Sequence, residues 1–300
     1  MIPLISSLSY GPLEVLQLPR TWWKVLLRRE GLLDEEYPDC SGGLDSKMIK
    51  ALGLDKDAVL SYLRDTRPDY LTFERWVVER CGGQIDRASA DAWNKSVRDR
   101  QHADHKIEET YNDIGWDTSS VDVTSAYVLN ATQDWQLFHQ RDLNANYLRF
   151  GNQVVPLISN LDYGRLGVSQ LPRTWYKILM RSKNLLHPDY PDMTKSGLDP
   201  RVLEVVGIKP DQAVAHIRRE QPDYAQFEQW VLDKNDGALD QNAIEEWNGF
   251  LQARTHKGEK QAGILATLGR EDNTDMASAA ILNMTEDFHY AYHQLMDNAG

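Results

Sequence analysis

Apolar residues recur three and four positions apart through most of this chain. Phe73, Trp76 and Val77 form one such stripe, and Phe227 and Trp230 belong to the same stripe in the second half. This spacing places the apolar side chains on one face of an α-helix. No run of alternating β-branched residues, typical of strands, is found, so the pattern predicts an all-α fold.

Capping residues predict where the helices of the first half begin and end. Gly53 suits the end of one helix, because glycine tolerates the left-handed backbone conformation. Asp55 suits the start of the next, because its side chain can accept hydrogen bonds from free backbone N–H groups. The predicted helices span residues 19–30, 44–52, 56–66, 69–81, 87–112 and 121–141.

Much of the sequence of the first half of the chain recurs in the second half. Residues 3–11 return at 156–164, a shift of 153 positions, and residues 17–24 return at 170–177. This period is far longer than the ~20 to 50 residues of solenoid repeats, which indicates a duplicated domain. A polar residue that occurs in both copies is therefore a stronger candidate for a shared role in folding or function than a residue that occurs in one copy.

We predict two similar helical domains, residues 1–143 and 154–300, produced by internal duplication and related by a pseudo-twofold axis. A length of 300 residues suits two domains of ordinary size. Residues 144–153 lack a clear period and are predicted to join the copies.

Composition and charge narrow the classes of function. The net charge of −12 argues against binding to nucleic acid or to an anionic membrane, because both need clustered lysine and arginine. No apolar run approaches the length of a membrane span, and Met1 does not begin a signal peptide pattern. Cys40 and Cys81 both lie in the first copy, which excludes a disulfide common to both copies. We expect a soluble protein of the reducing cytoplasm.

The second copy contains several runs with a family resemblance. They are residues 189–191, 197–199 and 206–208 and, above all, Ala243-Ile-Glu-Glu-Trp-Asn-Gly-Phe-Leu251. In these runs the chain resembles a bacterial domain-of-unknown-function family, the one numbered 5069. The resemblance covers most of both copies and is weaker in the first. It implies an architecture, usually of a single such domain, but no activity, cofactor or substrate.

The strongest duplicated polar pattern is a row of cations in the first helix of each copy. Their spacing of four residues aligns them on one helix face, where like charges repel, so something negative should face them. They are Arg20, Lys24 and Arg28 in the first copy and Arg173, Lys177 and Arg181 in the second.

Two interpretations of these cations remain open. In the first, acids such as Asp45 and Asp199 form an internal ion-pair network with them. In the second, Arg20, Lys24, Arg173 and Lys177 bind an anionic ligand, and the neighbouring Trp22 and Trp175 stack on a planar part of it.

Tyrosines near these helices are candidates for acid–base chemistry. Tyr10 and its counterpart Tyr163 precede the basic helices closely. A tyrosine can act as a general acid if a nearby cation lowers its pKa. The alternative is that both tyrosines lie at the edge of the core with satisfied hydroxyl groups.

A metal site is a further candidate near the C-terminal end. Glu286, His289 and His293 could offer their side chains to a metal from one helix face. The matching positions of the first copy are glutamines, Gln133, Gln136 and Gln140. Because a helical metal site needs further ligands from other helices, these three are weak candidates, and no cofactor is predicted.

Three hypotheses about function follow from the sequence. The first is a protein that binds a small anionic or aromatic molecule in a pocket lined by arginine, lysine, tryptophan and tyrosine, with cofactor-independent acid–base chemistry in one copy. The second is a non-catalytic scaffold for a partner protein. The third is a helical metal-dependent enzyme. The ligand, the reaction and the oligomeric state are left open.

Overall fold

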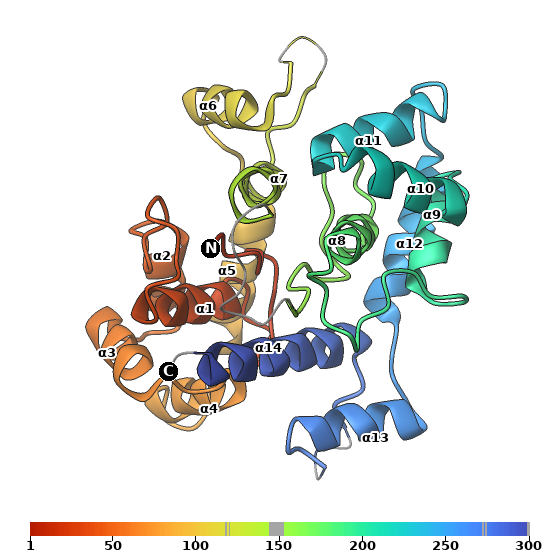
Figure 1. Cartoon of the computed structure of the whole chain (residues 1–300). Coiled ribbons are helices and arrows are strands. Elements are labelled where there is room, and N and C mark those ends of the chain that lie inside the picture. Colours follow the sequence, from red (N-terminus) through yellow and green to blue (C-terminus); the bar gives the residue numbers. More distant parts are fainter. Residues whose placement is uncertain (118, 120, 144–152, 272, 274, 299–300) are drawn as a thin grey trace. The chain divides into compact units, whose positions relative to one another are not determined.

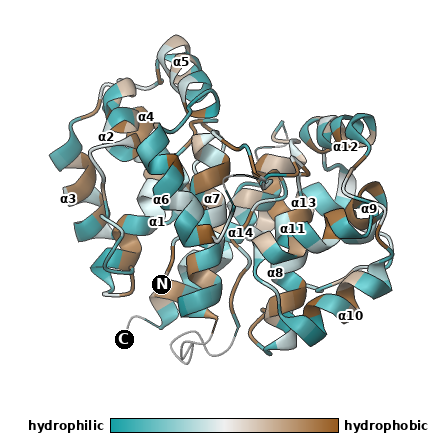
Figure 2. Cartoon of the chain, turned by 90° about the horizontal axis from the view of Figure 1, so that it is seen from above, coloured by the Kyte–Doolittle hydropathy of each residue, from teal (hydrophilic) through white to brown (hydrophobic). Residues whose placement is uncertain are grey.

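The computed structural model describes residues 1–117, 119, 121–143, 153–271, 273 and 275–298, and confirms the predicted all-α fold for them. The described residues form fourteen α-helices and one π-helix, and their only β-pairing is in isolated bridges. Figure 2 shows that individual helices such as α3 and α10 carry both hydrophobic and hydrophilic residues, as their amphipathic patterns require. Among the described helices, none is both long and apolar enough to cross a membrane.

The helices of the first half are labelled in Figure 1. They are α1 (Leu18–Arg29), α2 (Leu44–Ala51), α3 (Lys56–Thr66), α4 (Tyr70–Arg80), α5 (Arg87–Arg98), α6 (Asp104–Ile114) and α7 (Ala126–Leu137), which continues as the π-helix η1 (Phe138–Asp142). The helices of the second half are α8 (Leu171–Ser182), α9 (Leu198–Val205), α10 (Pro210–Glu220), α11 (Tyr224–Asp233), α12 (Gln241–Ala253), α13 (Gly258–Thr267) and α14 (Ala279–Asp297).

The first four predicted helices agree with α1 to α4 within one residue at each end. Local signals decide these ends: Asp55 and Asp69 each accept a hydrogen bond from a first-turn N–H group, at 2.8 Å in both cases.

The last two predicted helices of the first half need correction. The predicted helix 87–112 is two helices, α5 and α6. The chain turns between them because Gln101 pairs with Ser125 and the His102 N–H donates to the Thr124 carbonyl at 3.0 Å. The predicted helix 121–141 begins only at Ala126, where Ser125 is the N-cap. The predicted joining segment 144–153 falls almost entirely outside the described residues.

Two compact units are formed, and they divide the chain differently from the sequence repeats 1–143 and 154–300. Unit 1 comprises Met1–Arg100 with Thr255–Gly300, and unit 2 comprises Gln101–Arg254. We call the first five helices of a repeat its body and the last two its hairpin. Unit 1 thus combines the body α1–α5 with the hairpin α13–α14, while unit 2 combines the hairpin α6–α7 with the body α8–α12.

Aromatic side chains join hairpin to body within unit 1. The ring of Phe288 on α14 lies 5.1 Å from Tyr70 on α4 and 6.2 Å from Trp22 on α1, centroid to centroid, and all three are buried. Figure 1 shows α14 beside α1 and α4. Burying a large apolar side chain contributes about 1.5–3 kcal/mol, so this contact fixes the hairpin on the body.

Unit 2 makes the corresponding contact with residues of its own hairpin. Trp135 on α7 packs edge-on against Tyr224 on α11 at 4.7 Å, and Phe138 of η1 lies 5.1 Å from Tyr176 on α8. Each unit therefore has an aromatic core between the hairpin and the body.

Candidate functional site

The central cation of the first helix is neutralised inside unit 1. Lys24 Nζ lies 2.6 Å from Asp45 Oδ2, and only 4% of Lys24 and 0% of Asp45 is exposed. Asp45 also accepts hydrogen bonds from Thr21 Oγ1 at 2.6 Å and from the Ser41 N–H at 2.8 Å. Burial alone would raise the pKa of Asp45, but Lys24 and these donors hold it below its usual value.

The same contacts recur at the matching positions of unit 2. Lys177 Nζ lies 2.7 Å from Asp199 Oδ2, which is buried and faces Thr174 as well. This arrangement corresponds to the internal ion-pair network, the first of the two interpretations drawn from the sequence.

The first arginine of each row binds backbone carbonyl groups of the segment before its helix. Arg20 Nη1 donates to the carbonyls of Pro3 and Ile5 at 2.7 and 2.8 Å. Arg173 Nη1 donates to the carbonyls of Pro156 and Ile158 at 3.0 and 2.7 Å. These guanidinium groups therefore tie the start of each body to its first helix.

The predicted stacking tryptophans lie in the cores. Trp22 and Trp175 are 0% exposed, and their Nε1–H groups donate to the carbonyls of Pro68 and Pro222 at 2.9 and 3.0 Å. Their faces contact other aromatic rings of their units, so they do not offer a surface to a ligand.

The surroundings of Tyr10 and Tyr163 do not favour the predicted acid–base role. Burial, together with Glu14, raises the pKa of Tyr10, although Arg98 opposes the shift. This direction is opposite to the lowered pKa that the acid–base hypothesis requires. The ring of Tyr163 packs against Tyr127 at 4.8 Å, and its backbone N–H donates to the Tyr127 hydroxyl at 3.0 Å.

A cavity of about 170 Å³ in unit 1 gathers several polar side chains from distant parts of the sequence. It lies where the first turn of α4 meets α14 and the turn between α13 and α14. Its polar lining is Asp69, Thr72, Arg75, Arg270, Thr285, His289 and His293. We call this the unit 1 cavity.

The first turn of α4 orders one side of the unit 1 cavity. Asp69 caps the helix by accepting from the Thr72 N–H at 2.8 Å, and it also accepts from Thr72 Oγ1 at 2.7 Å. Arg75 Nη2 in turn donates to Thr72 Oγ1 at 2.8 Å. The Asp69 carboxylate is thus held at the N-terminal end of α4, where the helix dipole favours a negative charge.

Two histidines one turn apart on α14 form the other side. The rings of His289 and His293 lie 4.3 Å apart between centroids. Burial and the neighbouring His293 lower the pKa of His289, although Asp69 opposes the shift. His289 is therefore mainly neutral at pH 7 and can donate one hydrogen bond and accept another.

The sequence-based metal set is not assembled. Among the described residues, no group of three or more His, Cys, Asp or Glu side chains is arranged to hold a metal ion. Glu286 therefore does not complete a site with His289 and His293, which line the cavity as a pair.

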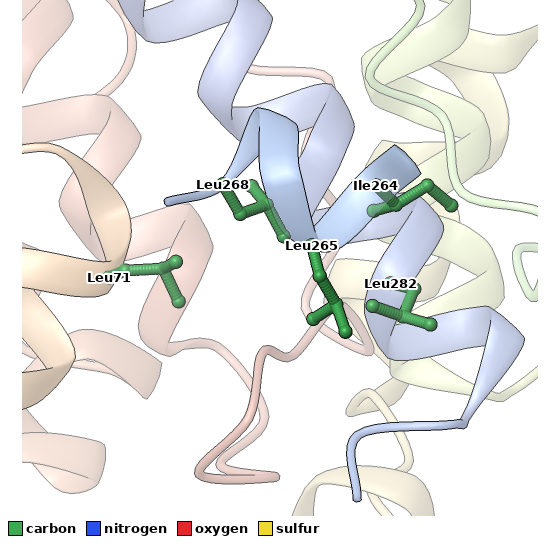
Figure 3. Close-up of a cluster of buried hydrophobic side chains, with 5 residues drawn as sticks. All are labelled: Leu71, Ile264, Leu265, Leu268 and Leu282. Carbon is green, nitrogen blue, oxygen red and sulfur yellow. The ribbon is translucent and has the colours of Figure 1, made fainter. Parts of the chain in front are cut away.

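Arg270 enters the unit 1 cavity from the turn between α13 and α14. Its N–H donates to the Leu265 carbonyl at 2.8 Å, and the preceding Leu268 belongs to the hydrophobic cluster drawn in Figure 3. That cluster packs α13 and α14 together and includes Leu71 of α4. With the residues that the structure describes, the Arg270 guanidinium makes no hydrogen bond or ion pair, and neither does Arg75 form an ion pair.

A cavity of about 490 Å³ occupies the matching place in unit 2. We call it the unit 2 cavity. It keeps an aspartate at the helix start, Asp223, but the charged positions differ. Where unit 1 has Arg75, Arg270, His289 and His293, unit 2 has Gln229, Trp116, Gln136 and Gln140.

Each unit also buries a glutamate that the sequence analysis missed. The Leu13 N–H donates to both carboxyl oxygens of Glu74 at 3.3 Å, and the Tyr70 hydroxyl donates to Glu74 Oε1 at 2.7 Å. Burial raises the pKa of Glu74 to about 7, and burial likewise raises that of Glu228 to about 7. The repeated spacing of Tyr70 and Glu74 in the second copy was the available signal.

A cation lies near each buried glutamate, but it comes from a different segment in each unit. Arg270 of the unit 1 hairpin lowers the pKa of Glu74, against the larger effect of burial. In unit 2, Arg165 Nε lies 3.9 Å from Glu228 Oε2, and position 116, which matches Arg270, is tryptophan. The Arg165 guanidinium lies over the Trp116 ring at 5.8 Å and donates to Gln229 at 2.8 Å, whereas Arg270 makes neither kind of contact with the described residues.

Gly11 should not tolerate a side chain, because the buried glutamate is close. A Cβ atom there would lie 2.3 Å from Tyr70 Cε1 and 2.7 Å from Glu74 Oε1. We expect Gly11→Ala to lower the free energy of unfolding by about 1–3 kcal/mol, as overpacking does. Chemical denaturation would measure it, with Gly42→Ala, which has no atom within 4 Å, as the control. Equal stability of the two variants would contradict the close packing.

The fold and this cavity define an all-helical protein of two units, one of which has a cationic cavity. Comparisons with family models, with curated proteins and with solved structures found no match to the chain. The resemblance to the family numbered 5069 stays a prediction, and function is inferred from the site alone.

Proposed function

We propose that the protein binds a small anionic molecule in the unit 1 cavity. The observation that carries this proposal is the excess of cationic groups there. Arg75 and Arg270 line the cavity without an ion-pair partner in the described chain, and the carboxylate of Asp69 is held at the start of α4. An anion would offset the two guanidinium charges through charge-assisted hydrogen bonds.

The histidine pair suits the same ligand. His289 is partly buried and its pKa is lowered, so the neutral ring can donate a hydrogen bond to a carboxylate or phosphate oxygen. A neutral imidazole beside a bound anion is also a suitable general base, which makes cofactor-independent acid–base chemistry a further part of the proposal. His289 then takes the role that the sequence suggested for Tyr10 and Tyr163.

The charge difference between the two cavities supports anion binding in unit 1 and a different role for the cavity of unit 2. A cavity is kept in both, but its two arginine positions and its two histidine positions become neutral residues in unit 2. The two guanidinium charges of the unit 1 cavity are therefore absent at the matching positions of unit 2.

We expect unit 1 to bind inorganic phosphate or succinate, and Arg270→Gln to weaken that binding about 10- to 100-fold. The reason is that a hydrogen bond to a charged group contributes about 1.5–3 kcal/mol. Isothermal titration calorimetry would measure it, with salt expected to weaken binding. Arg80→Gln, an exposed position at the other end of α4, is the matched control.

Two results would refute the proposal. One is that neither anion binds to the folded protein. The other is that Arg270→Gln and Arg75→Gln bind as tightly as the unchanged chain, which would place the anion elsewhere.

The other two hypotheses have less support. A scaffold should present a broad apolar surface. Among the described residues, Phe250 is the one large apolar side chain that is exposed, and the Arg201 guanidinium lies 4.3 Å from its ring. A metal-dependent enzyme would need a ligand set, and the described residues contain none.

We further propose that the two repeats arose by duplication of one ancestral domain and keep a pseudo-twofold relation. Support comes from the matched helices and from the repeated pairs Lys24 with Asp45 and Lys177 with Asp199. A cytoplasmic location is proposed as well, because Cys40 and Cys81 are free thiols.

A further inference from the structure

The unit 2 cavity contains buried polar atoms without hydrogen-bond partners. Trp116 Nε1 and Gln136 Oε1 belong to residues that line it, and neither atom makes a hydrogen bond to the described residues. Trp116 is 9% exposed and Gln136 is 8% exposed. A buried polar group without a partner costs about 1–3 kcal/mol, so two of them in the lining of one cavity favour a bound ligand.

The size and lining of the cavity are those of a small-molecule site. Its volume of about 490 Å³ lies within the range of about 300–1,000 Å³ typical of ligand pockets. Side-chain amides dominate the lining, which includes Gln136, Gln140, Gln226 and Gln229. An amide offers both a donor and an acceptor, so the wall can recognise groups that do the same.

The charged residues that line the cavity have partners within unit 2. Asp113 accepts from Gln133 Nε2 at 2.6 Å, and Asp117 accepts from the Ser119 N–H at 2.9 Å. Arg165 lies over the ring of Trp116, donates to Gln229 and faces Glu228. Asp223 accepts from the Gln226 N–H at 2.8 Å and from Gln136 Nε2 at 3.3 Å. What remains for a ligand is the Trp116 indole donor and the glutamine amides, and all of these groups are uncharged.

We propose that the unit 2 cavity is a second binding site, for a neutral polyhydroxyl molecule of the size of a monosaccharide or sugar alcohol. Each hydroxyl group of such a ligand can both donate and accept a hydrogen bond, as the unpartnered donor Trp116 Nε1–H and the unpartnered acceptor Gln136 Oε1 require. This site is separate from the anion site of unit 1 and does not depend on it.

The substitution Trp116→Phe tests whether the indole N–H group of Trp116 binds a ligand. The substitution keeps an aromatic ring under Arg165, but it removes the second ring of the indole together with the N–H group. In the free protein it should cost only the packing of the lost ring, because the buried N–H donor has no partner to lose. In the presence of a ligand it should weaken binding about five- to ten-fold, because one hydrogen bond is lost.

The experiment titrates ¹⁵N-labelled full-length protein with D-glucose, D-galactose and sorbitol. The chain has nine tryptophans, and the Trp116 indole signal is identified by its absence from the Trp116→Phe spectrum. We expect at least one probe to shift this signal in a saturable way, and the Trp116→Phe variant to bind that probe more weakly. Arg270→Gln in unit 1 should bind it as the unchanged protein does.

Three outcomes would overturn the inference. The first is that no neutral probe moves the Trp116 indole signal of the folded protein. The second is that inorganic phosphate moves it more strongly than any neutral probe, which would indicate an anion site. The third is that Trp116→Phe binds the probe as tightly as the unchanged protein, which would leave the indole N–H group without a part in binding.

Discussion

Asp45→Ala should lower the free energy of unfolding of unit 1 by about 3–5 kcal/mol, because removing one partner of a buried ion pair leaves the other charge buried and alone. Lys24 is almost fully buried, and burial lowers its pKa despite the opposing effect of Asp45. Without the carboxylate, Lys24 must lose its proton or draw in water. The Thr21 hydroxyl and the Ser41 N–H would lose an acceptor as well.

Urea unfolding followed by tryptophan fluorescence would measure this loss. Asp199→Ala should cost a similar amount in unit 2, where the same contacts occur, and the exposed Asp65→Ala is the control. The double variant Lys24→Met with Asp45→Leu should recover much of the stability, because neither charge is then left alone. If Asp45→Ala left stability unchanged but altered anion binding, the first-helix cations would be a ligand site after all.

Protein stability should fall as the pH rises from about 4.5 to about 8, because of the two buried glutamates. The pKa of each is raised in the folded state from 4.5 to about 7. Between these values the folded protein keeps protons that the unfolded chain has released, so a rising pH favours unfolding. The loss is nearly complete at about pH 8 and amounts to about 3 kcal/mol for each carboxyl group.

Substitution by glutamine should remove this pH dependence from one unit at a time. Glu74→Gln should be more stable than the unchanged chain at pH 8 and show little difference at pH 4.5, and Glu228→Gln should do the same in unit 2. Denaturation curves at several pH values would measure both, with the exposed Glu246→Gln as the control. A stability that stays constant or rises between pH 5 and 8 would mean that the carboxyl groups are ionised at little cost.

The site differed from its sequence-based prediction for a physical reason. The rows of cations around Lys24 and Lys177 are the strongest repeated polar pattern, but a residue is repeated also where both units need it for folding. The structure places them against internal acids and carbonyls. His289 and His293 were found by their spacing on one helix, yet Arg270 and Asp69 could not be joined to them, because they lie in other segments of the chain.

Glu74 was missed for a different reason. Glutamate is among the residues least often buried, so the amphipathic pattern of α4 gives no warning that its carboxyl group lies in the interior. Only the contacts with Leu13 and Tyr70 reveal it.

The sequence by itself determined the helical class, the repeat and most helix ends, because periodicity, N-caps such as Asp55 and Asp69, and turn glycines act over a few residues. The tertiary structure alone decided which hairpin completes which body. That choice depends on contacts such as Phe288 with Trp22, which are 266 positions apart (288 − 22), and no local pattern specifies them. The unit 1 cavity lies at this contact, and therefore the site was decided there too.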